Sequence, residues 1–305
     1  MSLHRALVTP KARVQQAFAR AAEQYDAAAI LQREVHDRMF ARLDYIQLKP
    51  QQVIDLGCGT GYGLPQLGNR YPDAQILGLD MALDMLRYAR GQRPSRWQQW
   101  WQKLSASPAQ RQYLCADIEK LPLANACVDL LWSNLALQWC QDLDATFTEM
   151  QRVLAPQGLI MFSTLGPDTL REIRQAFAGV DGYTHVNHFV DMHDLGDALV
   201  RHGFENPVMD MEFITLTYDN VPAVFRDLKQ IGAYNHTEGR AKGLMGKHTW
   251  QQVVHNYEQL RRADGRLPLT YEVIYGHAWQ ASPATTTSTR TDDGRQVINF
   301  YPRAR

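Results

Sequence analysis

Five short apolar runs, separated by segments of helical length, organise the first half of the chain. They cover residues 53–56, 76–80, 113–117, 128–133 and 159–163. Short apolar runs bounded by glycine or polar residues are typical of buried strands. Because these runs alternate with helical segments, the pattern indicates βαβ units and a parallel sheet covered by helices on both faces.

After residue 166 the pattern changes, and two strand-like segments, 211–218 and 269–279, flank a helical stretch over about 222–262. We expect the two segments to form an antiparallel pair that closes the sheet edge, with the helices between them as a lid over 220–266. The sequence therefore predicts a doubly wound, Rossmann-like α/β fold with a seven-stranded sheet. The sheet core is expected over 45–218 plus 268–280.

The two ends of the chain carry further signals. Helical periodicity over 11–48, between Pro10 and Pro50, predicts N-terminal helices that cover the ligand site. One domain is expected over 1–280, with a Trp-rich insertion at 94–111. The polar, low-complexity segment 281–294 predicts a flexible tail over 281–305, although 296–301 alternates like a short strand.

Composition limits the class of protein. Hydrophobic residues make up 45% and charged residues 21% of the chain, as in globular proteins with a buried core. Because 32 basic residues balance 32 acidic ones, bulk affinity for nucleic acid is not expected. No apolar run approaches the roughly 20 residues that span a bilayer, and the N-terminus has no apolar signal segment. A cytoplasmic protein without a membrane contact is the expectation.

Cysteine and histidine spacing gives no metal signal. The four cysteines, Cys58, Cys115, Cys127 and Cys140, form no C-x-x-C pair. His185 and His188 are three residues apart but have no second pair or nearby carboxylate motif. We therefore expect reduced cysteines, histidines in surface or packing roles, and no metal.

A glycine-rich turn follows the first predicted strand, at Gly57, Gly59 and Gly61. Such a turn lets backbone approach a ligand closely, but a tight strand-to-helix turn is the structural alternative. Tyr62 stands where a dinucleotide fingerprint needs its third glycine. Asp55, two residues before Gly57, suits an ammonium group better than a pyrophosphate. The loop therefore favours a nucleoside that carries an amino acid.

Further polar groups follow successive strands at the same sheet edge. Asp80 is placed to accept hydrogen bonds from a ribose diol, to cap the next helix, or both. Asp117 suits an adenine amino group, and Ile118 suits one face of its ring. Asn134 and Leu135 are expected to line the same cleft.

These segments carry a family resemblance. VIDLGCGTG, ILGLD, ADIEKLPL and the VDLLWSN and RVLAPQGLIMFS segments together resemble class I S-adenosylmethionine-dependent methyltransferases. FARAAEQYDAAAILQREV, TLGPDTLREIRQAF, DLKQIGAYNHTEGR and LPLTYEVIYG resemble the malonyl-[acyl-carrier protein] O-methyltransferases of biotin biosynthesis. The resemblance implies S-adenosylmethionine as co-substrate. It also implies methyl transfer to the free carboxylate of malonyl-acyl carrier protein, giving the ester that primes pimelate synthesis.

The chemistry implied by the resemblance needs no general base, because a carboxylate is ionised at pH 7. It calls for a fixed cation. Arg152 is the first candidate, although an arginine before a V-L-x-P-x-G turn can be structural. Arg226, Lys229 and Arg240 in the predicted lid are alternatives. Tyr25 is expected either at the substrate or in the core.

The predicted lid also carries an excess of basic residues. Eight lysines and arginines stand against four acids over 222–266, a balance of 8 − 4 = +4. Such a surface would steer an acidic carrier protein, and the alternative is a solvated helical face. Two other functions stay open: a methyltransferase for a quinone precursor or other small molecule, and an assembly factor of this fold for a respiratory subunit.

Overall fold

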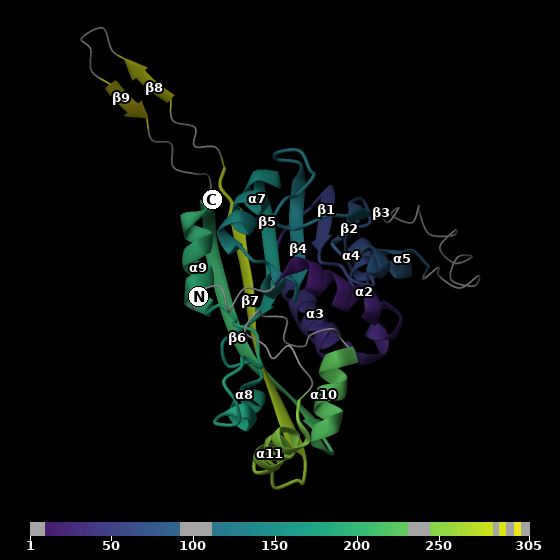
Figure 1. Ribbon diagram of the computed structural model, residues 1–305. Helices are drawn as coiled ribbons and strands as arrows, with labels where there is room; N and C mark the ends of the chain where they lie inside the picture. The colour runs from purple at the N-terminus through teal and green to yellow at the C-terminus, as the bar shows by residue number, and fades with distance from the viewer. Residues whose placement is uncertain (1–9, 92–111, 231–244, 283–286, 291–295, 300–305) are drawn as a thin grey trace.

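The computed structural model describes residues 10–91, 112–230 and 245–282, with two further strands at 287–290 and 296–299. The architecture is a central sheet with helices on both faces, and a separate two-stranded sheet follows near the C-terminus (Figure 1). The insertion predicted at 94–111 lies outside the described residues.

Seven strands form the central sheet in the order β3-β2-β1-β4-β5-β7-β6. Neighbouring strands from β3 to β5 are parallel, whereas β7 is antiparallel to both β5 and β6. This confirms the predicted fold class, with one refinement: β7, the last strand of this sheet in sequence, lies between β5 and β6. The bounds are β1 Gln52–Leu56, β2 Gln75–Asp80, β3 Gln112–Cys115, β4 Val128–Asn134, β5 Leu154–Leu165, β6 Phe204–Tyr218 and β7 Leu267–Gln280.

Successive strand residues enter different cores, because side chains alternate between the faces of a sheet. In β1, Val53 joins the cluster formed with α3 and α4, whereas Ile54 joins the cluster formed with α7 and α9. Leu130 and Leu131 of β4 divide in the same way. Both faces are therefore apolar, which explains why the strands read as continuous hydrophobic runs. These helices are α3 Ile30–Arg42, α4 Leu64–Arg70, α7 Leu143–Val153 and α9 Met192–Arg201.

The N-terminal segment folds into two helices and a 3₁₀ turn rather than one continuous helix. Helix α2 begins after Pro10, as predicted, and ends at Ala29, where ψ of 48° breaks the helix. The chain continues through α3 to Lys49 and Pro50. The bounds of the remaining N-terminal elements are α2 Lys11–Ala28, η1 Leu43–Tyr45 and α5 Leu83–Gly91.

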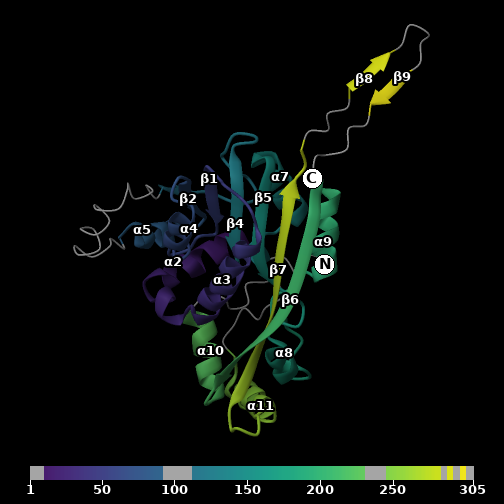
Figure 2. The same cartoon turned by 180° about the vertical axis from the view of Figure 1, so that it is seen from behind.

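Strands β6 and β7 are the longest in the sheet and extend past the carboxyl end of β5 (Figures 1 and 2). Three helices gather at that end of the β6–β7 pair, and α10 also contacts α2. The described part of the helical stretch predicted over 222–262 contains two helices, α10 and α11. The bounds are α8 Arg171–Phe177, α10 Val221–Gln230 and α11 Lys247–Glu258.

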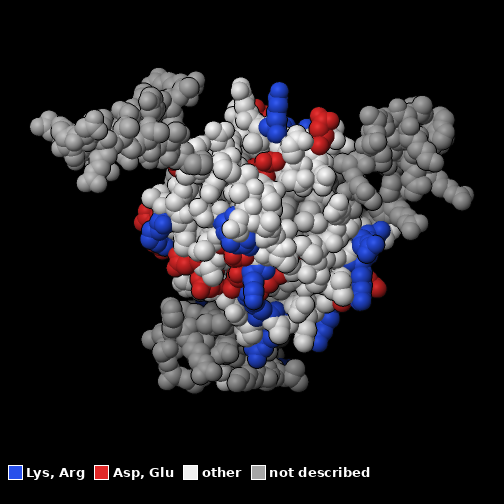
Figure 3. Space-filling view, turned by 90° about the horizontal axis from the view of Figure 1, so that it is seen from above, with Lys and Arg blue, Asp and Glu red and all other residues white. Residues whose placement is uncertain are grey.

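A small hairpin lies near the C-terminus. Strand β8, Thr287–Arg290, pairs with β9, Gln296–Asn299, in a separate two-stranded sheet. Composition predicted a flexible tail here, so the strand at 287–290 is a correction, and it provides the partner that the alternating segment lacked. None of the described helices is long and apolar enough to cross a membrane. On the face seen in Figure 3, basic and acidic side chains are interspersed.

Candidate functional site

The glycine turn after β1 has the backbone conformation that its sequence requires. Gly57, Gly59 and Gly61 have φ of 77°, 53° and 82°, a region that other residues rarely adopt. A Cβ on Gly57 would lie 2.4 Å from the Cβ of Ala136, in the loop after β4. The turn is therefore held tightly against the neighbouring loop, with its backbone at the carboxyl edge of the sheet.

Asp80, at the end of β2, holds this turn in place. Its Oδ2 accepts a hydrogen bond from the Gly59 amide at 2.9 Å, and its Oδ1 accepts one from the Ala82 amide at 2.7 Å. Burial raises the pKa of the Asp80 carboxyl, and these two bonds partly offset the effect. Asp80 therefore caps the start of the next helix, one of its two expected roles, and it also lines the pocket.

Asp55 is a buried carboxyl, 4% exposed, beside the glycine turn. Burial, followed by the nearby charge of Asp80, raises its pKa to about 8. Among the described residues no lysine, arginine or histidine forms an ion pair with it. A buried carboxylate without a cation is costly, so this site fits a ligand that brings a positive charge.

The other predicted residues come together in one pocket with the turn. The pocket is lined by Gly57, Gly59 and Asp80 together with Asp117, Ile118, Asn134 and Leu135. Gly61 lies on the opposite side of the turn. Asn134 also links the end of β4 to α3, because its Nδ2 donates to the Gln32 carbonyl at 2.9 Å. The strand ends therefore converge as the sequence predicted.

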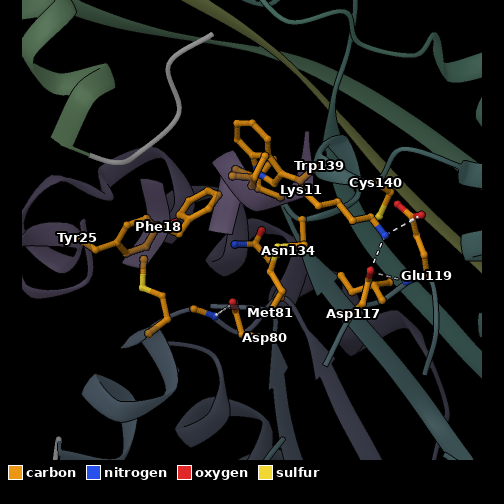
Figure 4. Close-up of a pocket in the computed structure, with 17 residues that line it drawn as sticks. Lys11, Phe18, Tyr25, Asp80, Met81, Asp117, Glu119, Asn134, Trp139 and Cys140 are labelled. Atoms are coloured by element: carbon orange, nitrogen blue, oxygen red, sulfur yellow. Dashed lines mark hydrogen bonds and ion pairs between the residues drawn. The ribbon is translucent and has the colours of Figure 1, made fainter. Parts of the chain in front are cut away.

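Helix α2 covers the pocket with apolar side chains (Figure 4). Phe18 contacts Trp139 edge-to-face, with ring centroids 5.4 Å apart. Tyr25 lines both this pocket and the adjoining one that contains Asp55. Burial and the charges of Asp80 and Asp26 raise the Tyr25 pKa, so the hydroxyl stays neutral. Tyr25 thus lines the pocket and also packs against a small core cluster that includes Ala82 and Met85.

Comparison with known proteins identifies the family. A sequence model described as a methyltransferase domain matches residues 54–162. The malonyl-[acyl-carrier protein] O-methyltransferase of Gallionella capsiferriformans (strain ES-2) is 56% identical over 95% of this chain and 96% of its own length. The protein of that name from Laribacter hongkongensis (strain HLHK9) is 56% identical over 98% of each chain. The chain belongs to this family.

The family relationship agrees with the fold. The crystal structure of the YcgJ protein from Bacillus subtilis superimposes with a TM-score of 0.55 at 12% identity, covering 82% of this chain and all of that one. The pocket fits S-adenosylmethionine on its own geometry. The unpaired Asp55 suits its ammonium, the glycine backbone leaves room for close approach, and Asp80 suits its ribose. Arg33, which lines the same part as Asp55, suits its carboxylate.

Lys11 is a site residue that the sequence did not reveal. Its Nζ lies 2.5 Å from Asp117 Oδ2 and 2.8 Å from Glu119 Oε2, which ties α2 to the loop after β3 (Figure 4). Burial opposes the charge, but the two bonds outweigh it and raise the pKa of Lys11. Asp117, which we expect to contact adenine, therefore also forms an ion pair with Lys11. Only the three-dimensional structure brings residues 11 and 117 together.

Replacing Lys11 with Met should loosen the cover over the pocket. A partly exposed ion pair contributes about 1 kcal/mol, or a factor of about five. We expect S-adenosylhomocysteine to dissociate about three to ten times faster, as measured by stopped-flow fluorescence. Lys49→Met, at an exposed lysine outside the pocket, is the matched control. Equal dissociation rates in both variants would show that the pair does not hold the cover closed.

The structure does not support Arg152 as the substrate cation. It lies in the last turn of α7, directly before β5, and therefore at the amino edge of the sheet, opposite the pocket. All five of its N–H groups donate at 2.8–2.9 Å, to the Glu149 carboxylate, the carbonyls of Leu121 and Leu123, and Asn125 Oδ1. Arg152 fastens the loop before β4, which is the structural alternative.

Arg152→Met should destabilise the fold without changing the cofactor site. Losing charged hydrogen bonds to this loop should lower the free energy of unfolding by about 1–3 kcal/mol. Urea denaturation measures this effect, and calorimetry should find an unchanged Kd for S-adenosylhomocysteine. Arg87→Met, at an exposed ion pair on α5, should change neither value. Weaker cofactor binding at full stability would restore a role for Arg152 in the site.

The lid cations are less available than the sequence suggested. Arg226 and Lys229 are exposed on α10, neither is among the described residues that line the cofactor pocket or the cavity beside α10, and Arg240 lies outside the described residues. Three other basic residues are paired with acids: Arg261 with Glu258, Arg262 with Asp264 and Arg266 with Asp219. Among the described residues, the basic side chains of this predicted surface that are exposed and form no ion pair lie on α10 and at the start of α11.

A second cavity adjoins the cofactor pocket, and Trp139 lines both. We call it the acceptor chamber. Its walls come from the end of β5, α8, the segment 185–189, α10 and β7, and they are mostly apolar. No local sequence signal predicts this cavity, because its walls come from segments that are far apart along the chain. Within the described residues no three His, Cys, Asp or Glu side chains gather as metal ligands.

Proposed function

We propose that this protein transfers a methyl group from S-adenosylmethionine to the free carboxylate of malonyl-acyl carrier protein. The observation that carries the proposal is 52–56% identity, over 95–98% of the chain, to relatives of that name. The joined pocket and acceptor chamber support it. The methyl ester masks a charge, so that the acyl group can be elongated toward pimelate for biotin.

Cofactor binding falls to residues at the sheet edge and on the covering helices. Asp55 and Arg33 bind the ammonium and carboxylate of the amino-acid end, and Asp80 binds the ribose. S-adenosylmethionine, when bound, supplies an electrophilic methyl group on its sulfonium. Phe18 and Tyr25 of α2 exclude water from above, which strengthens each charged contact inside.

The acceptor needs alignment rather than activation. Its carboxylate is already ionised at neutral pH, so no residue has to remove a proton. The acceptor chamber strips water from this oxygen and directs it past Trp139 toward the methyl carbon. An apolar wall also suits the thioester and the short acyl chain. Arg226 and Lys229, on the solvent side of α10, attract the acidic carrier protein.

A panel of acceptors tests this function. Labelled methyl transfer should occur with malonyl-carrier protein and not with acetyl-carrier protein, which has no free carboxylate. Succinyl-carrier protein measures how strictly acyl length is read. Transfer to a quinone precursor, but to none of the thioesters, would favour the small-molecule alternative. Cofactor binding without transfer to any acceptor would favour the assembly-factor alternative.

A further inference from the structure

The acceptor chamber contains few polar groups, and their position is informative. Its apolar walls include Leu165 at the end of β5, Ile173 of α8, and Phe225 and Leu228 of α10. Among the described residues that line it, polar side chains come from His185, Asn187, Tyr271 and the Trp139 indole. An anionic acceptor that enters this chamber therefore meets very few possible partners.

His185 is the one side chain of the described lining that can carry a positive charge. The other candidates face elsewhere. Arg226 and Lys229 are exposed on α10, whereas Phe225 and Leu228 of the same helix face the chamber. Arg152 lies at the opposite edge of the sheet with all its donors engaged.

The imidazole of His185 is held in a fixed orientation. Its Nε2 lies 2.7 Å from Asp181 Oδ1, and its ring stacks on Phe177 with centroids 3.5 Å apart and an interplanar angle of 13°. Burial would raise the Asp181 pKa, but bonds from His185 and the Tyr183 amide bring it below its usual value. Asp181 engages one ring nitrogen, Nε2, and the other, Nδ1, can donate a hydrogen bond when the imidazole is protonated.

No acidic side chain of the described chamber lining competes for Nδ1 of His185. Asp181 belongs to its own segment, and the neighbouring helices contribute Phe177, Ile173 and Phe225. From β7 the chamber receives Tyr271, whose buried hydroxyl has no hydrogen-bond partner and stays neutral because burial raises its pKa. Among the described residues that line the chamber, a carboxylate would thus meet one side chain that can carry a positive charge and no acidic one.

We propose that His185, oriented by Asp181, binds the free carboxylate of the acceptor and selects carboxylate-bearing acyl groups over neutral ones. The inference rests on the proposed function and names the cation which that function requires. It assigns selectivity to an ion pair inside the acceptor chamber. Methyl transfer itself stays with the cofactor pocket, so His185 is a specificity residue and Asp181 is a positioning residue.

Binding of charged and neutral carrier proteins tests the proposal. With S-adenosylhomocysteine bound, calorimetry compares malonyl-carrier with acetyl-carrier protein. His185→Gln should weaken malonyl-carrier binding about 10–100-fold, the effect of one charge-assisted hydrogen bond, and leave acetyl-carrier binding unchanged. His185→Lys, which keeps the charge, should recover part of the loss. His188→Gln, at an exposed histidine three residues away, is the control.

The outcomes separate this inference from the proposed function. Wild-type transfer to malonyl-carrier protein is measured first, and its absence would overturn the proposed function itself. If transfer occurs but His185→Gln binds malonyl-carrier protein normally, only the role of His185 is wrong. Equal losses for malonyl- and acetyl-carrier proteins would likewise overturn it, because a purely structural histidine affects both. A selective loss for the malonyl form, rescued by lysine, supports it.

Discussion

Asp55→Asn is expected to stabilise the ligand-free protein above pH 7 and to remove most of its affinity for S-adenosylmethionine. The folded protein holds a proton on Asp55 up to about pH 8, whereas the unfolded chain loses it near pH 4. The stability that this proton contributes is complete below pH 4 and is lost as the pH rises to 8. The loss approaches about 1.4 kcal/mol for each pH unit in this window.

Asparagine has no proton to lose, so the variant should lack this part of the pH dependence. Urea denaturation at pH 5, 6, 7 and 8 measures the slope of the unfolding free energy in both proteins. Asp73→Asn, at an exposed aspartate before β2, should keep the wild-type slope. Parallel slopes for wild type and Asp55→Asn would show that Asp55 is ionised in the empty site.

The same substitution removes the partner of the cofactor's ammonium. Losing one member of a buried ion pair costs about 2–5 kcal/mol, so the Kd should rise by about thirtyfold or more. Wild-type affinity should increase between pH 6 and pH 7.5, because the ammonium favours an Asp55 that has released its proton. Titration calorimetry in two buffers would detect that proton. Affinity that does not change with pH would contradict the assignment.

Gly57→Ala is expected to have the second largest effect, on both stability and cofactor binding. The left-handed backbone costs about 1–2 kcal/mol for any other residue. The added Cβ would also lie 2.4 Å from Ala136 and would push the loops after β1 and β4 apart. Overpacking of this kind costs about 1–3 kcal/mol more. Thermal unfolding and calorimetry should therefore show a marked loss of both melting temperature and affinity.

Gly59→Ala is the matched control for this clash. Gly59 also has a positive φ, but a Cβ there has no atom within 4 Å. Its loss of stability should be limited to the backbone cost of about 1–2 kcal/mol. Equal losses at both positions would indicate that backbone conformation, and not contact with Ala136, accounts for the glycine at 57.

The sequence predicts the sheet and the strand-end residues well because local signals specify them. Apolar runs locate β1 to β5, and polar residues directly after parallel strands must meet at one edge. That rule brings together Asp55, Asp80 and Asn134, which lie on different strands. The same rule excludes Arg152 from the site, because an arginine before a strand lies at the amino edge. The prediction that Arg152 binds the substrate was therefore wrong.

Other site residues could not be found from the sequence, because they depend on contacts between distant segments. Lys11 meets Asp117 only when α2 folds over the sheet. His185 looks like any exposed histidine until Phe177, Asp181 and the walls of the acceptor chamber surround it. The hairpin of β8 and β9 shows the same limit, since the polar composition of 287–290 hides a strand that pairs with 296–299.

The mass of the acceptor after reaction tests the central claim most directly. Malonyl-carrier protein is incubated with the enzyme and S-adenosylmethionine, and intact mass spectrometry follows the carrier. The account predicts that malonyl-carrier protein gains the mass of one methylene group. It also predicts that a carboxyl esterase removes this mass again, and that acetyl-carrier protein does not change. An unchanged malonyl-carrier protein, from an enzyme that binds the cofactor, would contradict it.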